Sequence, residues 1–216
     1  MQWKDFKSFV GRVLKEGRRL QRYDIAGKLT TTRRYTHTQI LCFVGALVLL
    51  FLLPQGVNDN FAEYAIAFLG IFVGLFTSII IALYDKSNSL YDGIQHKTGN
   101  EKSRIAIIRN YLVQFTGLTA YTIILALIAV VLLLGILLFP ETRINIWKYH
   151  FIDQWRDLNL TTTLTFLRLA IVILFRVFLF NLLLNFFLVT LYSLSSYFSF
   201  LQSEYKTLGL SSAEEK

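Results

Sequence analysis

The strongest constraint on this fold is a set of four long apolar stretches, at about 39–53, 62–84, 105–139 and 160–190. A helix needs roughly 20 apolar residues to cross the ~30 Å hydrocarbon core of a bilayer. The composition agrees, because 54% of the residues are hydrophobic and only 17% are charged. Such values argue against a soluble globular domain and against disorder. We therefore predict an all-α fold, a polytopic membrane helical bundle with four transmembrane helices.

Basic residues are distributed unevenly among the connections. Ten lie in residues 1–37, five in 85–110 and two in 206–216, whereas 54–61 has none and 140–160 has three. Segments rich in Lys and Arg stay on the cytoplasmic side of a membrane. We therefore expect a multi-pass protein of the inner (plasma) membrane with both termini in the cytoplasm. The expected organisation is a basic tail at 1–37, a transmembrane domain at 38–205 and a flexible tail at 206–216.

The N-terminal segment has the pattern of an amphipathic helix, with an aromatic and aliphatic face opposite a basic one. The basic face contains Lys4, Lys7, Arg12, Lys15, Arg18, Arg19 and Arg22. This combination is typical of a helix that lies on an anionic inner leaflet. Packing on a neighbouring subunit or on the chain's own loops is the alternative. We expect no direct nucleic-acid binding by this face, because no RNA- or DNA-binding module surrounds it.

The fourth apolar stretch predicts a helix much longer than one span. It runs without Pro or Gly from 160 to 201, which corresponds to ~60 Å as a continuous helix. We expect residues 190–205 to extend into the cytoplasm. Apolar residues recur there at three- and four-residue spacing: Leu191, Leu194, Phe198, Leu201 and Tyr205. Such a seam requires a partner helix, which could be the N-terminal helix, a second copy or a soluble protein.

Several polar side chains fall inside the predicted spans, where they are costly and often functional. Glu63 and Arg168 could form an ion pair at the outer interface or reach the headgroups separately. Arg176 lies ~12 Å deeper along the helix and needs water, lipid phosphate or a protein acceptor. Asn181 and Asn185 lie four residues apart on another face of the same helix. Such a pair can join helices by hydrogen bonds.

Two further segments carry packing patterns. Gly70 and Gly74 form a GxxxG motif in the second span, which permits close approach of another helix, within the subunit or between subunits. The 140–160 connection carries Trp147, Phe151 and Trp155 at four-residue spacing, which predicts a short helix on the outer surface.

Sequence motifs for catalysis are missing from the chain. It has no HExxH, Walker, CxxC or GxSxG motif, and its three histidines lie in three different polar segments. The single cysteine, Cys42, lies in the first span and is interpreted as a buried small apolar residue. We therefore expect no enzyme activity, no cofactor and no metal site.

The layout of the chain resembles small membrane components of bacterial anti-phage systems, most of all the membrane subunit of the Kiwa system. The resemblance rests on the basic tail, the four spans and the extension near Leu191–Tyr205, and on no specific motif. It implies a homo-oligomer that senses phage-induced disturbance of the envelope. It also implies a soluble, DNA-binding defence partner bound on the cytoplasmic side.

Two functions are compatible with these patterns. The first is a non-catalytic oligomeric membrane sensor or scaffold that recruits a soluble cytoplasmic partner, which the seam and the basic tail favour. The alternative is a pore-forming or ion-conducting oligomer that perturbs the membrane potential. Arg176 and the polar residues of the fourth helix favour this alternative, in which Arg176 would surround a central axis and select anions.

Overall fold

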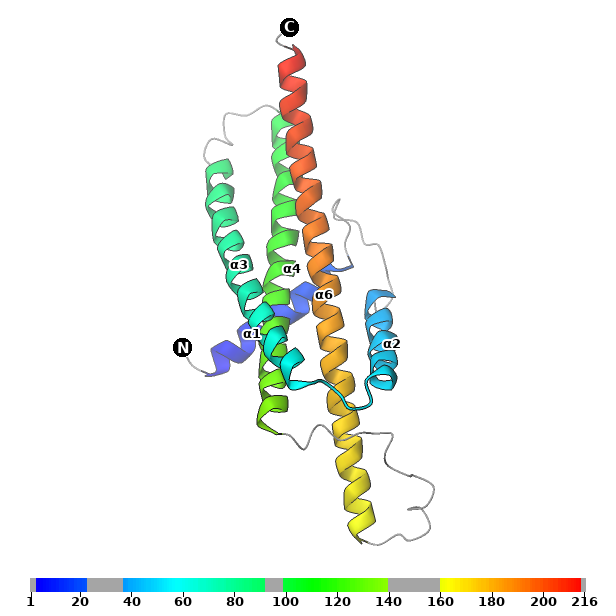
Figure 1. Cartoon of the computed structure of the whole chain (residues 1–216). Helices are drawn as coiled ribbons and strands as arrows, with labels where there is room; N and C mark the ends of the chain where they lie inside the picture. Colours follow the sequence, from blue (N-terminus) through cyan, green and yellow to red (C-terminus); the bar gives the residue numbers. More distant parts are fainter. Residues whose placement is uncertain (1–2, 23–36, 92–98, 140–159, 215–216) are drawn as a thin grey trace. The chain divides into compact units, whose positions relative to one another are not determined.

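The structure is a computed structural model that describes residues 3–22, 37–91, 99–139 and 160–214. These residues form five helices and no strand. In chain order the helices are α1 (Trp3–Leu20), α2 (His37–Leu52), α3 (Asp59–Tyr91), α4 (Gly99–Leu138) and α6 (Leu160–Glu214) (Figure 1). The predicted all-helical class is therefore confirmed for the described part of the chain.

Three of the helices contain segments long and apolar enough to cross a membrane. These segments are Asp59–Tyr84 in α3, Ile108–Leu138 in α4 and Thr163–Ser199 in α6. Helix α2 is also apolar but has 16 residues, so it extends only ~24 Å, less than the hydrocarbon thickness. A helical protein with three long apolar spans is thus confirmed, whereas the fourth span and the orientation of the termini stay predictions.

Two helices extend further than the sequence pattern indicated. The second apolar stretch ended at about residue 84, but α3 continues to Tyr91 because no Pro or Gly interrupts it before Gly93. Helix α6 runs to Glu214, so residues 206–214, expected in a flexible tail, are helical. The surface helix expected around Trp147–Trp155 lies outside the described residues.

The chain divides into two compact units. The first comprises Met1–Thr36, Phe72–Ile124 and Phe187–Lys216, and the second comprises His37–Ile71 and Leu125–Phe186. Helices α3, α4 and α6 are each divided between the two units. The two units are described separately below.

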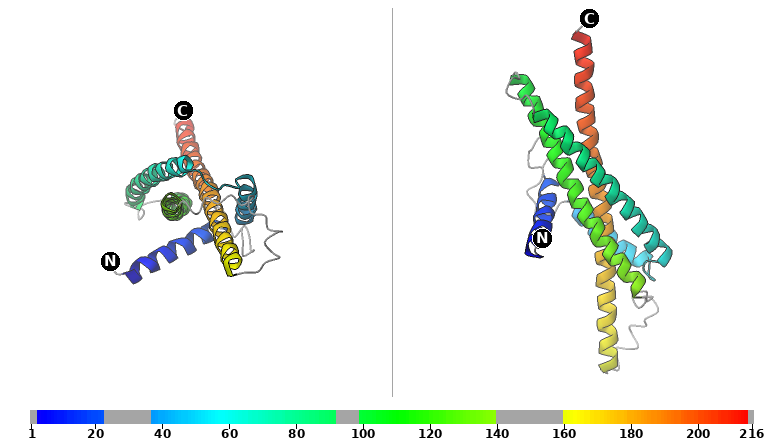
Figure 2. Two further views of the ribbon diagram at one scale, coloured as in Figure 1. Left: turned by 60° about the horizontal axis from the view of Figure 1, so that its bottom comes forward. Right: turned by 90° about the vertical axis from the view of Figure 1, so that its left-hand side faces the viewer.

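In the first unit, α4 packs against the C-terminal part of α6 (Figures 1 and 2). The contact is partly polar, because the hydroxyls of Thr119 and Ser193 lie 2.9 Å apart, and both side chains are fully buried. Next to them, the rings of Phe115 and Tyr197 are 5.2 Å apart between centroids. Small hydroxyl side chains let two apolar helices approach closely and also join them by hydrogen bonds.

Helix α1 joins the same unit through two glycines. Gly17 of α1 lies against the Tyr121 ring, and a Cβ atom added to Gly17 would overlap that ring. Conversely, Leu20 of α1 lies against Gly117 of α4, where an added Cβ would overlap the leucine side chain. Each helix therefore offers a glycine to a large side chain of the other, and this fixes the C-terminal end of α1 on α4.

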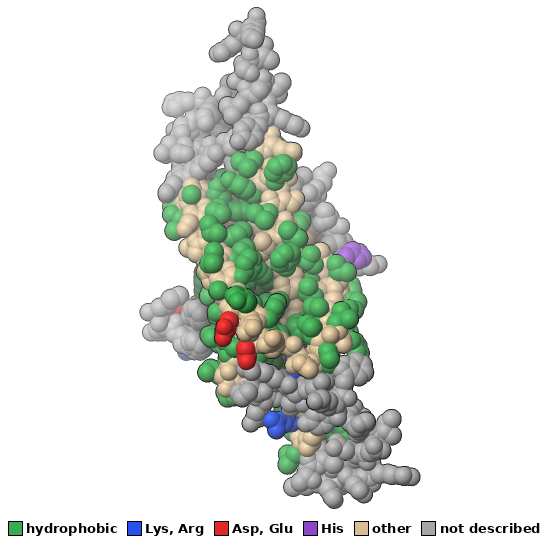
Figure 3. Space-filling view, in the orientation of Figure 1, with side chains coloured by type: hydrophobic (Ala, Val, Ile, Leu, Met, Phe, Trp, Pro, Cys, Tyr) green, Lys and Arg blue, Asp and Glu red, His purple; other side chains and the backbone are tan. Residues whose placement is uncertain are grey.

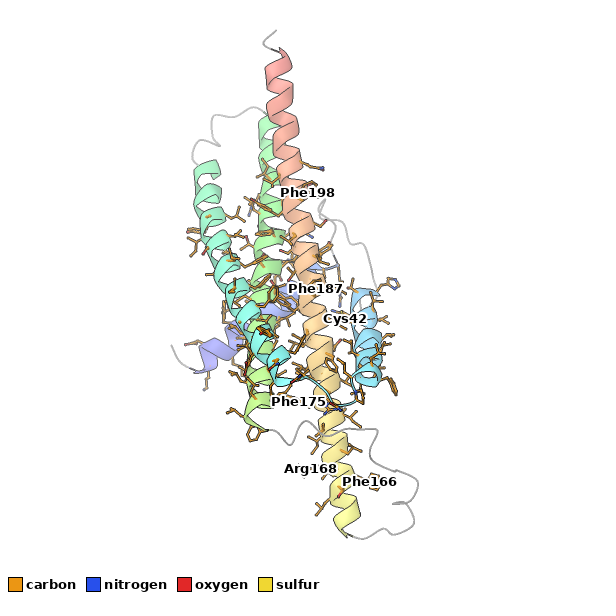
Figure 4. The ribbon with its side chains drawn as sticks, viewed as in Figure 1. Cys42, Phe166, Arg168, Phe175, Phe187 and Phe198 are labelled. Atoms are coloured by element: carbon orange, nitrogen blue, oxygen red, sulfur yellow. The ribbon has the colours of Figure 1, made fainter. Side chains whose placement is uncertain are left out.

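The core of the second unit is formed by α2 and the adjoining parts of α3, α4 and α6. Its fully buried side chains include Ala46, Ala129, Leu133 and Leu179. Cys42 on α2 is only 2% exposed, which agrees with its interpretation as a buried small residue (Figure 4). Many large apolar side chains lie on the outside, and hydrophobic atoms dominate the described surface visible in Figure 3. A lipid-facing surface has this character.

Candidate functional site

The most specific polar site in the described residues surrounds Arg176 of α6. Its side chain is only 2% exposed. Its Nη1 donates a hydrogen bond to the carbonyl oxygen of Pro54 at 2.9 Å, and its Nη2 donates one to the carbonyl of Gln55 at 3.1 Å. The two terminal nitrogens of the guanidinium therefore donate to two consecutive backbone carbonyls of the turn between α2 and α3.

The sequence explains why this turn presents its carbonyls. Pro54 cannot continue the helical hydrogen bonding of α2, and Gly56 closes a turn by donating its N–H to Leu53 O at 2.9 Å. Gly56 has φ +80°, a left-handed conformation that glycine adopts without a steric penalty. A Cβ at this position would lie 2.8 Å from Cζ of Arg176. Glycine is therefore needed both for the backbone conformation and for the space of the guanidinium.

The electrostatic environment also favours the cation. The last carbonyls of a helix have no intrahelical donor and carry partial negative charge. The guanidinium lies just beyond the C-terminal end of α2, where it neutralises that end of the helix dipole. Among the acceptors that the sequence left open for Arg176, protein carbonyls are the ones present in the structure.

Glu63 and Arg168, the other charged residues predicted within spans, both have exposed side chains. Arg168 lies near the N-terminal end of α6 (Figure 4). Their position on the surface is compatible with either a pair or separate contacts with headgroups. The ion pair between them stays a prediction.

Asn181 and Asn185 are half-buried. They lie on a different face of α6 from Arg176, as their spacing predicted. Neither carboxamide has a hydrogen-bond partner within the described part of the chain. Both therefore remain available to a group outside it.

The GxxxG motif of α3 was expected to contact a helix either within the subunit or in another subunit. Gly70 and Gly74 are exposed, and a Cβ added to either would meet no described atom within 4 Å. The described residues therefore supply no helix for close approach within the subunit. Contact with another subunit stays a prediction.

The apolar seam of α6 faces outward. Leu191, Leu194 and Phe198 are 51%, 45% and 61% exposed, and Leu201 is half-buried. In contrast, Ser193 and Ser196 of the same segment are buried. The serines therefore form the contact inside the subunit and leave the seam available to a partner. The side chain of Tyr205 lies outside the described residues.

The basic face of α1 is largely open. Exposed residues are Lys4, Lys7, Arg12, Lys15, Arg18 and Arg19, and Arg22 is half-buried. Arg19 also forms an ion pair with Glu16 at 2.6 Å. On the apolar face Phe9 is 49% exposed, so the glycine contact with α4 covers only the C-terminal part of the helix. One end of α1 therefore packs on protein, and contact of the remaining part with a membrane surface stays a prediction.

Sequence reasoning missed the two contacts that organise these helices. The acceptors of Arg176 are backbone atoms, and the only available signal was the Pro54–Gly56 turn. The reciprocal contact of Gly17 and Gly117 was also missed, although Gly17 interrupts the amphipathic N-terminal pattern and Gly117 interrupts an apolar stretch. Among the described residues, no three His, Cys, Asp or Glu side chains lie close enough together to hold a metal ion.

The fold and these contacts define an all-helical protein with three helices suited to membrane insertion. No protein-family model matches the chain, and no curated protein or solved structure is significantly similar to it.

Proposed function

We propose that this chain is a non-catalytic oligomeric scaffold or sensor of the inner membrane that recruits a soluble cytoplasmic partner. The observation that carries the proposal is the orientation of α6 in the first unit. Buried Ser193 and Ser196 make the internal contact, while Leu191, Leu194 and Phe198 remain exposed. Helices α4 and α6 already pack together through the other side of α6. An exposed apolar seam with regular three-four spacing is therefore suited to bind a helix of another protein.

The contact between Arg176 and the turn at residues 54–56 suggests where α6 crosses the outer membrane boundary. The polar backbone of the turn at residues 54–56 would be costly in hydrocarbon, so a level at or near the outer headgroups is favoured for this turn. Arg176 contacts the turn directly. About 20 residues from there cross the hydrocarbon and end near residue 196. In this proposal residues 160–175 stand on the outer side, and the seam crosses the inner boundary and continues into the cytoplasm.

The same contacts weaken the pore alternative. That interpretation required Arg176 to line a hydrated axis, but its donors bind the carbonyls of Pro54 and Gln55. A guanidinium held in this way stabilises a turn. An anti-phage role stays a proposal that rests on layout alone.

Helix α1 fits the scaffold role as a surface element on the cytoplasmic side. Its C-terminal end is fixed on α4 by Gly17 and Leu20, and its exposed cations face away from that contact. Anionic lipid headgroups are the partner expected for these cations. The helix would thus hold the part of the seam that lies beyond the inner boundary close to the membrane surface.

A co-purification experiment tests the recruitment. Full-length tagged protein is isolated from its native host in mild detergent, as wild type, as Leu194→Ser with Phe198→Ser, and as Ser195→Ala. Ser195 is exposed and adjacent to Leu194, so its variant is a control for changes that leave the seam intact. We expect one soluble protein to be retained by the wild type and the control and lost from the double variant. Absence of any soluble protein in all three samples would contradict the proposal.

A further inference from the structure

A second regular face lies on the N-terminal half of α6, in the second unit. Its members follow four-three-four-three-four spacing: Leu167, Ile171, Leu174, Phe178, Asn181 and Asn185. The four apolar side chains are 59%, 58%, 69% and 53% exposed in that order, and both asparagines are half-buried. This spacing is that of the a and d positions of a coiled coil. We name these six residues the Leu167–Asn185 face.

The chemistry of this face does not suit the surroundings of a single copy. With the boundary near Arg176, Leu167, Ile171 and Leu174 stand on the aqueous side, where exposed apolar area is unfavourable. Asn181 and Asn185 lie ~8 and ~14 Å inside the hydrocarbon, measured along the helix axis. Their carboxamides find no hydrogen-bond partner in the described part of the chain, and lipid offers none. One helix laid along the face would cover both halves.

We propose that the Leu167–Asn185 face is the docking site for the same face of a second copy of this chain. A carboxamide is both donor and acceptor, so asparagine is complementary to itself. Copies inserted in one membrane share one orientation, so two α6 helices pair in parallel. In a parallel pair equal positions oppose each other, which brings Asn181 to Asn181 and Asn185 to Asn185 of the partner.

The extent of the face agrees with such a contact. From Leu167 to Asn185 it extends ~27 Å along α6, about five helical turns, so it can form several layers of knobs-into-holes contacts. Buried asparagines at a or d positions also fix the register of paired helices. The proposal rests on the proposed function for the level of the boundary. It is independent of partner recruitment, which involves Leu191–Phe198.

Disulfide crosslinking in native membranes tests this docking site. The native thiol is first removed by Cys42→Ala, and single cysteines are then introduced as Phe178→Cys or Phe187→Cys. These two phenylalanines are 53% and 57% exposed, and nine residues place them on opposite sides of the helix, about 180° apart. Figure 4 labels Phe187 on α6. Mild oxidation should give at least tenfold more covalent dimer with Phe178→Cys than with Phe187→Cys.

The asparagines are tested in the Phe178→Cys protein. Asn181→Leu with Asn185→Leu keeps the size of the side chains but removes the hydrogen bonds, and should lower the yield of dimer about threefold to tenfold. Asn181→Gln with Asn185→Gln should retain a larger share of the dimer than the leucine pair.

Equal yields at positions 178 and 187, or no dimer at either, would overturn the proposal. A thiol at position 178 that crosslinks only to a different protein would also overturn it. Loss of a soluble partner with no change in this crosslink would instead concern the proposed function alone.

Discussion

Arg176 shows how a charge can be accommodated in a largely apolar chain without an acidic partner. Its guanidinium stays protonated at any accessible pH, so burial requires acceptors. The carbonyls of Pro54 and Gln55 in the turn after α2 meet this need, and the guanidinium in turn supplies donors to these two backbone groups. Removing the side chain would leave the carbonyls of Pro54 and Gln55 without these hydrogen-bond donors.

Arg176→Gln should therefore destabilise the fold. Glutamine has no charge and only one amide nitrogen, so it cannot reproduce two charge-assisted hydrogen bonds. We expect the free energy of unfolding in detergent to fall by about 2–4 kcal/mol, measured by circular dichroism during denaturant titration. Arg168→Gln, an exposed arginine on the same helix, should change it by about 0.5 kcal/mol or less. Equal effects of both substitutions would contradict the role assigned to Arg176.

The limits of sequence reasoning are also clear at this scale. The position of Arg176 in an apolar stretch, together with its charge, was enough to indicate that it needed an acceptor. Which acceptor it finds depends on a turn more than a hundred residues earlier, and backbone carbonyls leave no mark in a sequence. The position of Gly56 beside the guanidinium could be recognised only after the turn was located in space.

Among the helices, patterns that depend on one helix alone were predicted well. The amphipathic spacing indicated α1, and the absence of Pro from 160 onward indicated a long α6, although its continuation to Glu214 was not foreseen. Contacts between helices were predicted less well. Gly70 and Gly74 show which side of α3 permits close approach, but not whether this chain supplies the neighbouring helix.

The docking of α1 on α4 leads to a prediction at the level of helices. Gly17→Leu places a large side chain where the Tyr121 ring lies, so the C-terminal end of α1 should detach from α4. We expect faster cleavage by trypsin after Arg18 and Arg19 in protein held in detergent micelles, followed by mass spectrometry. Gly11→Leu is the matched control, because a Cβ at Gly11 meets no described atom within 4 Å. If both variants are cleaved at the wild-type rate, the glycine contact does not hold α1 in place.

For the molecule as a whole, the four apolar stretches led to the correct class. Three helices of membrane-spanning length are present, and only α2 is shorter than a full span. The functional surfaces were less predictable, because exposure depends on which side of each helix the others cover. The seam at Leu191–Phe198 was recognised from its spacing, but its outward orientation follows from the buried Thr119–Ser193 contact on the other side.

The central claim is that this protein organises others at the membrane and that Arg176 stabilises its fold instead of lining a conduction path. Planar-bilayer recordings of the purified full-length protein test this claim most directly. We predict that wild-type protein, reconstituted at increasing density, gives no conductance above the protein-free bilayer, and that Arg176→Lys and Arg176→Glu also give none. A reproducible anion-selective conductance in the wild type, with selectivity reversed or abolished in Arg176→Glu, would contradict the account.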